Sequence, residues 1–210
     1  MAKTAQPQKI LENLIVGLKD VDTLMSGNNK DEESGLQLKE ALGVFLLSEA
    51  MNFAYSQKGE NITFSILTND GSDALNEDGA IQIHFNDEST SLVTYLEQVS
   101  VTSHQEGDIN AEIESQLQKK NRKYTNEYYE NRSLLVFIEK VGAISIEEVK
   151  AYLRTEHPFG FYSAFVLEKN EDSILTYAIV NLDINKDTYS KFFVKIDTDN
   201  KTYEVTDRDE

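Results

Sequence analysis

The chain contains no cysteine, and only three of its 210 residues are histidine. The absence of cysteine excludes a disulfide framework, a thiolate metal site and a cysteine nucleophile. Three scattered histidines give little support to a catalytic nucleophile–base arrangement. The sequence also contains no Gly-rich phosphate-binding loop and no dinucleotide-binding fingerprint after a strand pattern. Several common enzyme classes are therefore disfavoured.

Long hydrophobic runs are absent as well. No apolar stretch approaches the roughly 18 residues that a membrane-spanning helix requires. Residues 1–20, MAKTAQPQKILENLIVGLKD, carry a charge on nearly every helical turn and lack the apolar run of a signal peptide. We therefore expect a cytoplasmic protein of bacterial or phage type, with no membrane partner.

Positive charge is scarce, because 20 Lys and Arg residues stand against 37 Asp and Glu, for a net charge of −17. This balance weighs against broad, non-specific binding of nucleic acid, whose phosphates need cationic partners. One segment, residues 115–132, concentrates the positive residues Lys119, Lys120, Arg122, Lys123 and Arg132. Two interpretations stay open for it: a solvated helix face, or a phosphate-facing stripe that makes weak contact with nucleic acid.

Apolar residues make up 40% of the chain and include ten Phe and ten Tyr, enough for one sizeable core. They recur at helical spacing in residues 7–25 and again in 36–57. The stretch between these two segments is rich in Gly, Asn and acidic residues, which is typical of a linker. We therefore predict an N-terminal helical segment, residues 1–30, and a single domain over residues 36–210.

The remaining pattern predicts a mixture of strands and helices. Residues 62–66 alternate apolar and polar side chains as a half-buried strand does, whereas residues 89–101 fit either a strand or a helix. The continuous apolar run 133–139 is typical of a central strand buried on both faces. Helices are predicted at 108–130 and 145–153, and C-terminal strands at 173–206 that end in a hairpin. The expected fold is α+β (α/β), a mixed central sheet flanked by helices.

The stretch GSDALNEDGAIQIHFND, residues 71–87, is predicted as a short strand, a turn and a second strand. Asp73 stands at its start and His84 would face it. One interpretation is a turn aspartate with an ordinary strand histidine. The other is a metal site, in which Asp73 and His84 hold Mn²⁺ or Zn²⁺ with an acidic partner such as Glu49.

The order of elements over residues 36–168 resembles the restriction-endonuclease-like superfamily, the PD-(D/E)XK fold. An opening helix, a strand meander, a helix and a buried strand follow one another in those proteins. The resemblance aligns Asp73 with the family's aspartate, His84 with its glutamate and Asn86 with its lysine. Glu49, on the opening helix, would occupy a position that is acidic in some members.

The family's chemistry needs two carboxylates to hold Mg²⁺ and a lysine to stabilise charge. His84 is a poor ligand for Mg²⁺, which prefers oxygen, and Asn86 supplies no positive charge. Lys120, on the following helix, could partly compensate. The resemblance therefore implies a degenerate core that binds rather than cleaves, and we expect no cofactor unless an active remnant site binds Mg²⁺ or Mn²⁺.

Two functions from different classes follow. The first is a non-catalytic binding protein with a degenerate nuclease-like core, an active metal-dependent nuclease being the less favoured form. The alternative is an acidic protein-interaction module, which could mimic the charge of nucleic acid. In either case the segment 7–25 could dock on the core or on a partner, including a second copy of the chain.

Overall fold

The computed structural model describes most of the chain. The described residues are 4–19, 31, 34, 36–68, 78–85, 90–101, 109–121, 132–138, 147, 151, 161–171, 173–183 and 189–207. Both expected N-terminal helices lie among them, as α1 (Pro7–Lys19) and α3 (Leu38–Gln57), and a third helix is α4 (Ile109–Asn121).

Local chemistry explains where α1 and α3 begin and end. Pro7 occupies the first position of α1, where a missing backbone N–H is harmless. At the start of α3, the Gln37 N–H donates to Glu40 Oε2 at 3.0 Å, which satisfies one of the donors that a helix start leaves open. After α3, Gly59 adopts φ +67°, a left-handed conformation that glycine tolerates at the end of a helix.

Eight strands form one sheet in which the sequence order is also the spatial order. The strands are β1 (Thr63–Ile66), β2 (Gly79–His84), β3 (Ser91–Val101), β4 (Arg132–Ile138), β5 (Phe161–Glu171), β6 (Ile174–Asp183), β7 (Tyr189–Asp197) and β8 (Thr202–Thr206). The pairs β3–β4 and β4–β5 are parallel, and all other neighbours are antiparallel. The segment 90–101, ambiguous in sequence, is therefore a strand that pairs with β2 and β4.

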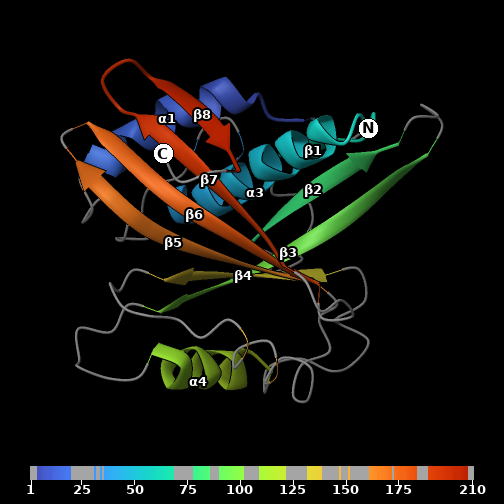
Figure 1. Ribbon diagram of the computed structural model, residues 1–210, viewed down its shortest axis with the longest axis vertical. Helices are drawn as coiled ribbons and strands as arrows, with labels where there is room; N and C mark the ends of the chain where they lie inside the picture. The colour runs from blue at the N-terminus through green and yellow to red at the C-terminus, as the bar shows by residue number, and fades with distance from the viewer. Residues whose placement is uncertain are drawn as a thin grey trace.

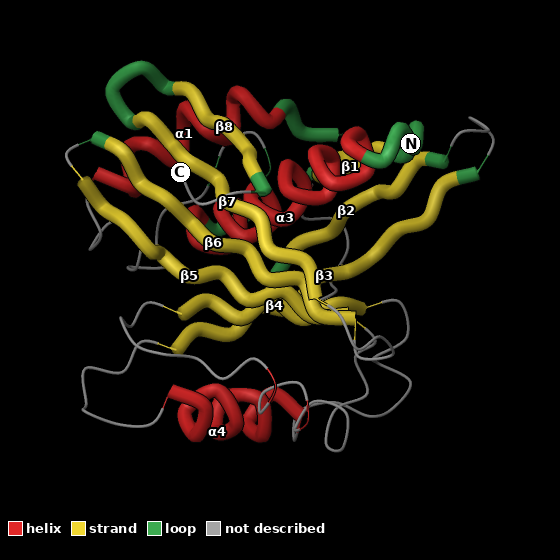
Figure 2. Tube along the Cα trace, viewed as in Figure 1, coloured by secondary structure: helices red, strands yellow, loops and turns green. Residues whose placement is uncertain are grey.

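The helices lie on both faces of this sheet, as Figure 1 shows: α1 and α3 cover one face, and α4 lies on the other, against β3. The sheet is strongly twisted and curved, and α3 lies in its concave face (Figure 2). For that reason α3 contacts β1 and β2 near one edge as well as β7 and β8 near the other. The expected α+β class, a mixed sheet flanked by helices, is confirmed.

The central strand β4 matches the expectation from its sequence. Its residues Leu134 and Leu135 are fully buried, and Val136 and Phe137 are 4% exposed. Such burial on alternate sides requires a covered sheet on both faces. The predicted C-terminal hairpin is also present as β7 and β8, joined by a turn in which Asp197 Oδ1 accepts bonds from the N–H groups of Asp199 and Asn200.

The N-terminal segment belongs to the same core as the rest of the chain. Ile10, Leu11 and Leu14 of α1 are fully buried and pack in one cluster with residues of α3. The Ala5 N–H donates to Ile66 O at 2.8 Å, so the chain before α1 also pairs beside β1. The apolar face of α1, predicted as a possible partner surface, is thus occupied within the chain. None of the described helices combines the length and the apolar character needed to cross a membrane.

Candidate functional site

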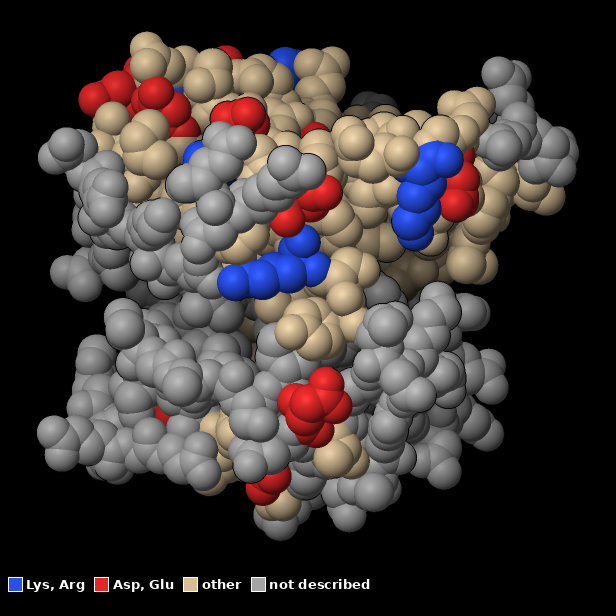
Figure 3. All heavy atoms as spheres, in the orientation of Figure 1, with Lys and Arg blue, Asp and Glu red and all other residues tan. Residues whose placement is uncertain are grey.

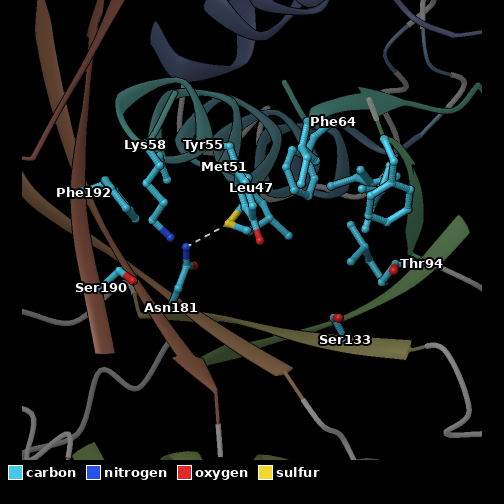
Figure 4. Close-up of a pocket in the computed structure, with 16 residues that line it drawn as sticks. Leu47, Met51, Tyr55, Lys58, Phe64, Thr94, Ser133, Asn181, Ser190 and Phe192 are labelled. Carbon is cyan, nitrogen blue, oxygen red and sulfur yellow. Dashed lines mark hydrogen bonds between the residues drawn. The ribbon is translucent and has the colours of Figure 1, made fainter. Parts of the chain in front are cut away.

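A cavity of about 520 Å³ lies between the C-terminal half of α3 and the concave face of the sheet (Figure 4). Its lining comes from the helix and from six strands or their ends, far apart in the sequence. The described lining residues are Leu47, Met51, Ala54, Tyr55, Lys58, Ile62, Phe64, Ile81, Ile83, Phe85, Thr94, Leu96, Ser133, Asn181, Ser190 and Phe192.

The cavity exists because the C-terminal part of α3 is supported at its sides, whereas the strands beneath it present small side chains. Toward β1, the Asn52 side chain bonds to Phe64 twice: Nδ2 donates to the backbone oxygen at 3.0 Å, and Oδ1 accepts from the N–H at 2.7 Å. Toward β7, the ring of Phe53 contacts that of Phe192 edge to face, with centroids 6.2 Å apart. Beneath the helix, β3 and β4 present the small side chains of Thr94 and Ser133. These leave space that larger side chains would fill.

One side of the cavity is apolar. Phe64 of β1, Ile81 and Ile83 of β2, and Leu96 of β3 line this side, and Ile81 and Leu96 are almost fully buried. Phe85, just after β2, also lines the cavity but is 39% exposed. The apolar surface therefore continues from the interior to the rim, where solvent reaches it.

The other side is polar, and Lys58, Asn181 and Ser190 converge there (Figure 4). Lys58 follows the last turn of α3, and its Nζ lies 5.1 Å from the centre of the Tyr55 ring. Asn181 is only 4% exposed, and its Nδ2 donates to Met51 Sδ at 3.2 Å. Ser190 stands opposite Asn181 in the register of β6 and β7. An apolar cavity with a few convergent polar groups is typical of a small-molecule site.

The described lining contains few titratable side chains. Lys58 and Tyr55 are the titratable groups among the described lining residues, and no carboxylate or imidazole stands beside them there to act as a general base. Within the described part of the chain, no three His, Asp or Glu side chains gather as a metal site would require. The chemistry that these residues offer is apolar contact, hydrogen bonding and one positive charge.

Glu49, a candidate for the remnant nuclease site, lies on α3 and faces β8. Its Oε2 accepts a 2.6 Å hydrogen bond from the Tyr203 hydroxyl. Burial raises the pKa of the Glu49 carboxyl, while the hydrogen bonds from Tyr203 and Asn52 oppose that rise. Burial and the neighbouring Glu49 carboxylate likewise raise the pKa of Tyr203. The contact ties α3 to an edge strand of the sheet.

His84 is the last residue of β2. Ile81 and Ile83 of β2 line the cavity, so the alternation of side chains directs His84 to the opposite face of the sheet. Glu49, on α3, lies on the concave side. The sheet therefore lies between His84 and Glu49, so the structure does not bring these two residues of the predicted Asp73–His84–Glu49 metal site together. Asp73 and Asn86 lie outside the described residues, and of the stretch 71–87 the structure describes one strand, β2.

The basic segment is divided between two elements. Lys119 is exposed on α4, and the α4 backbone includes Lys120, whose side chain is outside the described part, as are Arg122 and Lys123. Arg132 instead begins β4, and its guanidinium carbon lies 5.3 Å from the centre of the Tyr95 ring. The described part of the face in Figure 3 shows small, separate basic and acidic groups. Arg132 is therefore not on a helical stripe with Lys119.

The sequence patterns did not indicate the cavity residues. Ser133 and Asn181 offered the clearest signal, because each is a polar residue next to an apolar run of its strand. Both are buried, at 6% and 4% exposure. Lys58 offered a weaker signal, a lone cation after a helix that is apolar around most of its circumference. No spacing rule connects these three residues, since they come from three separate elements.

Comparison with known proteins does not indicate a function: no protein-family model matches the chain, and a search of curated proteins finds no match. The functional assignment therefore depends on the geometry and chemistry of this chain. The cavity has the size and the lining of a small-molecule binding site.

Proposed function

We propose that the chain is a non-catalytic binding protein whose ligand is a small, largely apolar molecule held in the cavity under α3. The observation that carries this proposal is the cavity itself, about 520 Å³ with apolar walls and a few polar groups at one side. Small-molecule sites span roughly 300–1,000 Å³ and have this kind of lining. The walls are formed by packed helix and strand residues, so the site requires little ordering on binding.

The proposal keeps the sequence-based expectation of binding without cleavage. The succession of α3, the meander β1–β3, α4 and β4 supports the suggested likeness to a restriction-endonuclease-like core, degenerate at its catalytic positions. A cytoplasmic location is part of the same proposal. The proposed ligand site, however, is the cavity on the concave face and not the remnant positions Asp73, His84 and Asn86.

The net charge of −17 favours a second candidate, the acidic protein-interaction module. Excess negative charge over a surface attracts basic partners and repels nucleic acid. This candidate needs no cavity, and its binding should weaken steeply as salt screens the charges. The two candidates are therefore separable by experiment.

The decisive experiment fills the cavity and measures binding of a neutral fluorescent probe, N-phenylnaphthylamine. Ala54 lines the cavity from α3, so Ala54→Phe should remove probe binding. Ala111→Phe, at an exposed position of α4 on the other face of the sheet, is the matched control and should bind like the wild type. Far-ultraviolet circular dichroism and thermal melting establish that both variants fold.

Saturable binding to the wild type that persists at high salt and disappears only in Ala54→Phe is the expected result. Absence of binding in the wild type, or equal binding by both variants, would overturn the assignment of the cavity. The acidic-module candidate would be favoured by a different result. In that case the wild type does not bind the probe but binds a basic protein such as histone, and this binding weakens as salt is added.

A further inference from the structure

We infer that the ligand is an anionic amphiphile, a long-chain carboxylate, whose head lies between Lys58 and Asn181. The apolar chain would extend toward Phe85. This inference rests on the proposed function, because it names the class of molecule that the same cavity takes. It depends on three further features: the sign of the charge at the cavity, the buried donor beside it, and the course of the apolar surface.

The charge comes from Lys58, which is the one charged side chain among the described lining residues. Its side chain extends from the end of α3 toward Asn181 on β6 (Figure 4). An ammonium group at the rim of an apolar cavity attracts an anionic head and repels a cationic one. The positive charge of Lys58 therefore favours a ligand with a negatively charged head, although the chain as a whole is acidic.

The end of α3 does not cancel this preference. The C-terminus of a helix carries partial negative charge on its free carbonyls, which disfavours an anion. Here the Tyr55 carbonyl accepts from the N–H groups of Lys58 at 3.2 Å and Glu60 at 3.0 Å, and the Ser56 carbonyl accepts from Gly59 at 3.0 Å. These bonds satisfy carbonyls of the last turn, and the ammonium of Lys58 is the one full charge among the described lining residues.

Asn181 and Ser190 supply hydrogen-bond donors next to Lys58. Asn181 Nδ2 donates a hydrogen bond to the thioether sulfur of Met51, a weak acceptor. A carboxylate is a stronger acceptor, so an entering head group would replace that bond with a better one. The Asn181 amide is almost fully buried, and a hydrogen bond there is little weakened by competing water.

The apolar surface explains why the ligand should carry a chain. It runs from Phe64 and Ile81 past Ile83 to Phe85 at the rim. Leu92, which stands opposite Ile83 in the β2–β3 register, is 44% exposed and continues the same surface outward. A flexible apolar chain can follow this path from the polar side to the rim and cover the apolar surface. A compact polar molecule would leave the apolar surface in contact with water.

The test compares three ligands with the same chain and different heads: dodecanoate, dodecanol and dodecylammonium. Each is titrated calorimetrically below its critical micelle concentration at neutral pH. Dodecanoate should bind about tenfold more tightly than dodecanol, the effect of roughly one charge-assisted hydrogen bond. Dodecylammonium should bind most weakly of the three.

Lys58→Met keeps the apolar stem and removes the charge. It should reduce the affinity for dodecanoate to that for dodecanol and leave dodecanol binding unchanged. Lys119→Met is the matched control, since Lys119 is an exposed lysine on the far face of the sheet. It should bind all three ligands as the wild type does. Because Lys58 is itself exposed, its replacement should preserve the fold.

Each outcome decides between the two proposals. If neither dodecanoate nor dodecanol binds the wild type, the proposed function is overturned together with this inference. If dodecanoate and dodecanol bind with equal affinity, or if Lys58→Met weakens the binding of both equally, the cavity still binds apolar molecules. The inference that the ligand has an anionic head is then wrong. Preference for dodecylammonium would also overturn the inference and leave the proposed function intact.

Discussion

The two halves of α3 have opposite roles, although they belong to one continuous helix. In the first half, from Leu38 to Ala50, most side chains are buried and pack around Phe45, whose ring contacts Tyr203 edge to face at 5.0 Å. In the second half, residues 51–55 are only half-buried, and Met51, Ala54 and Tyr55 line the cavity. The first half contributes the tight packing of the core, and the second leaves a space.

The difference shows how this fold combines stability with a site. Protein interiors are close-packed, and a cavity removes contacts from its lining. The loss can be offset when other parts of the same element pack closely. Substitutions in the first half should therefore change stability most, whereas substitutions in the second half should change ligand binding with little effect on folding.

The largest effect should come from Phe45→Ala, which removes a fully buried ring from the first half of α3. We expect a loss of about 3–5 kcal/mol in the free energy of unfolding. Tyr55→Ala, the counterpart in the half-buried second half, should cost only about 1 kcal/mol. Urea denaturation followed by circular dichroism measures both, and equal losses would remove the distinction between the two halves.

A smaller effect is expected from Gly43→Ala, at the closest approach of α3 to the sheet. An added Cβ would lie 1.9 Å from Gln98 Nε2 and 2.8 Å from Phe137 Cε2. The overlap should outweigh the better helix propensity of alanine and cost about 1–3 kcal/mol. Combining it with Gln98→Ala should recover part of the loss, since the nearest obstructing atom is then absent. Stability that is unchanged or increased in the single variant would contradict this close packing.

The contact between Glu49 and Tyr203 lies at the boundary of the two halves and should depend on pH. Because burial raises the pKa of folded Glu49, the folded state favours the protonated carboxyl. Its contribution to stability is present below the ordinary pKa, about 4.3, and is lost as pH rises through the raised value. The wild type should therefore lose stability relative to Glu49→Gln as pH increases across this range. A difference between the two unfolding curves that stays constant with pH would refute the effect.

The smallest effect on stability should come from Met51→Leu in the second half. The volume is nearly conserved, so the cost should stay under about 1.5 kcal/mol. The substitution removes the sulfur that accepts the bond from Asn181 Nδ2. We expect dodecanoate to bind as well or better, because its head no longer competes with the thioether. A loss of binding as large as that in Ala54→Phe would show that Met51 itself is needed.

Sequence patterns predicted the elements well where their signal is local. The apolar circumference of the second helix indicated burial, and the continuous apolar run 133–139 indicated a central strand, which is β4. Residues 89–101 could not be assigned, because an apolar spacing that suits both a helix and a strand is decided by the neighbours that supply hydrogen bonds. Here β2 and β4 supply them.

The candidate site was much less predictable. Asp73 and His84 attracted attention because they are polar and close in sequence, yet the alternation of β2 directs His84 away from the face on which α3 lies. Lys58, Ser133 and Asn181 are separated by about fifty to seventy-five residues from one to the next. Nothing in their local sequence indicates that they meet, because each is brought to the cavity by the pairing order of the sheet.

Local sequence was enough to indicate the three described helices, most of the described strands and the acidic balance of the chain, because periodicity, capping chemistry and charge are properties of short segments. The curvature of the sheet around α3, and the tight packing of that helix at one end and loose packing at the other, are tertiary features. They depend on the twist accumulated over eight strands and on side-chain volumes contributed by distant segments. The cavity, and with it the proposed function, follows from that curvature.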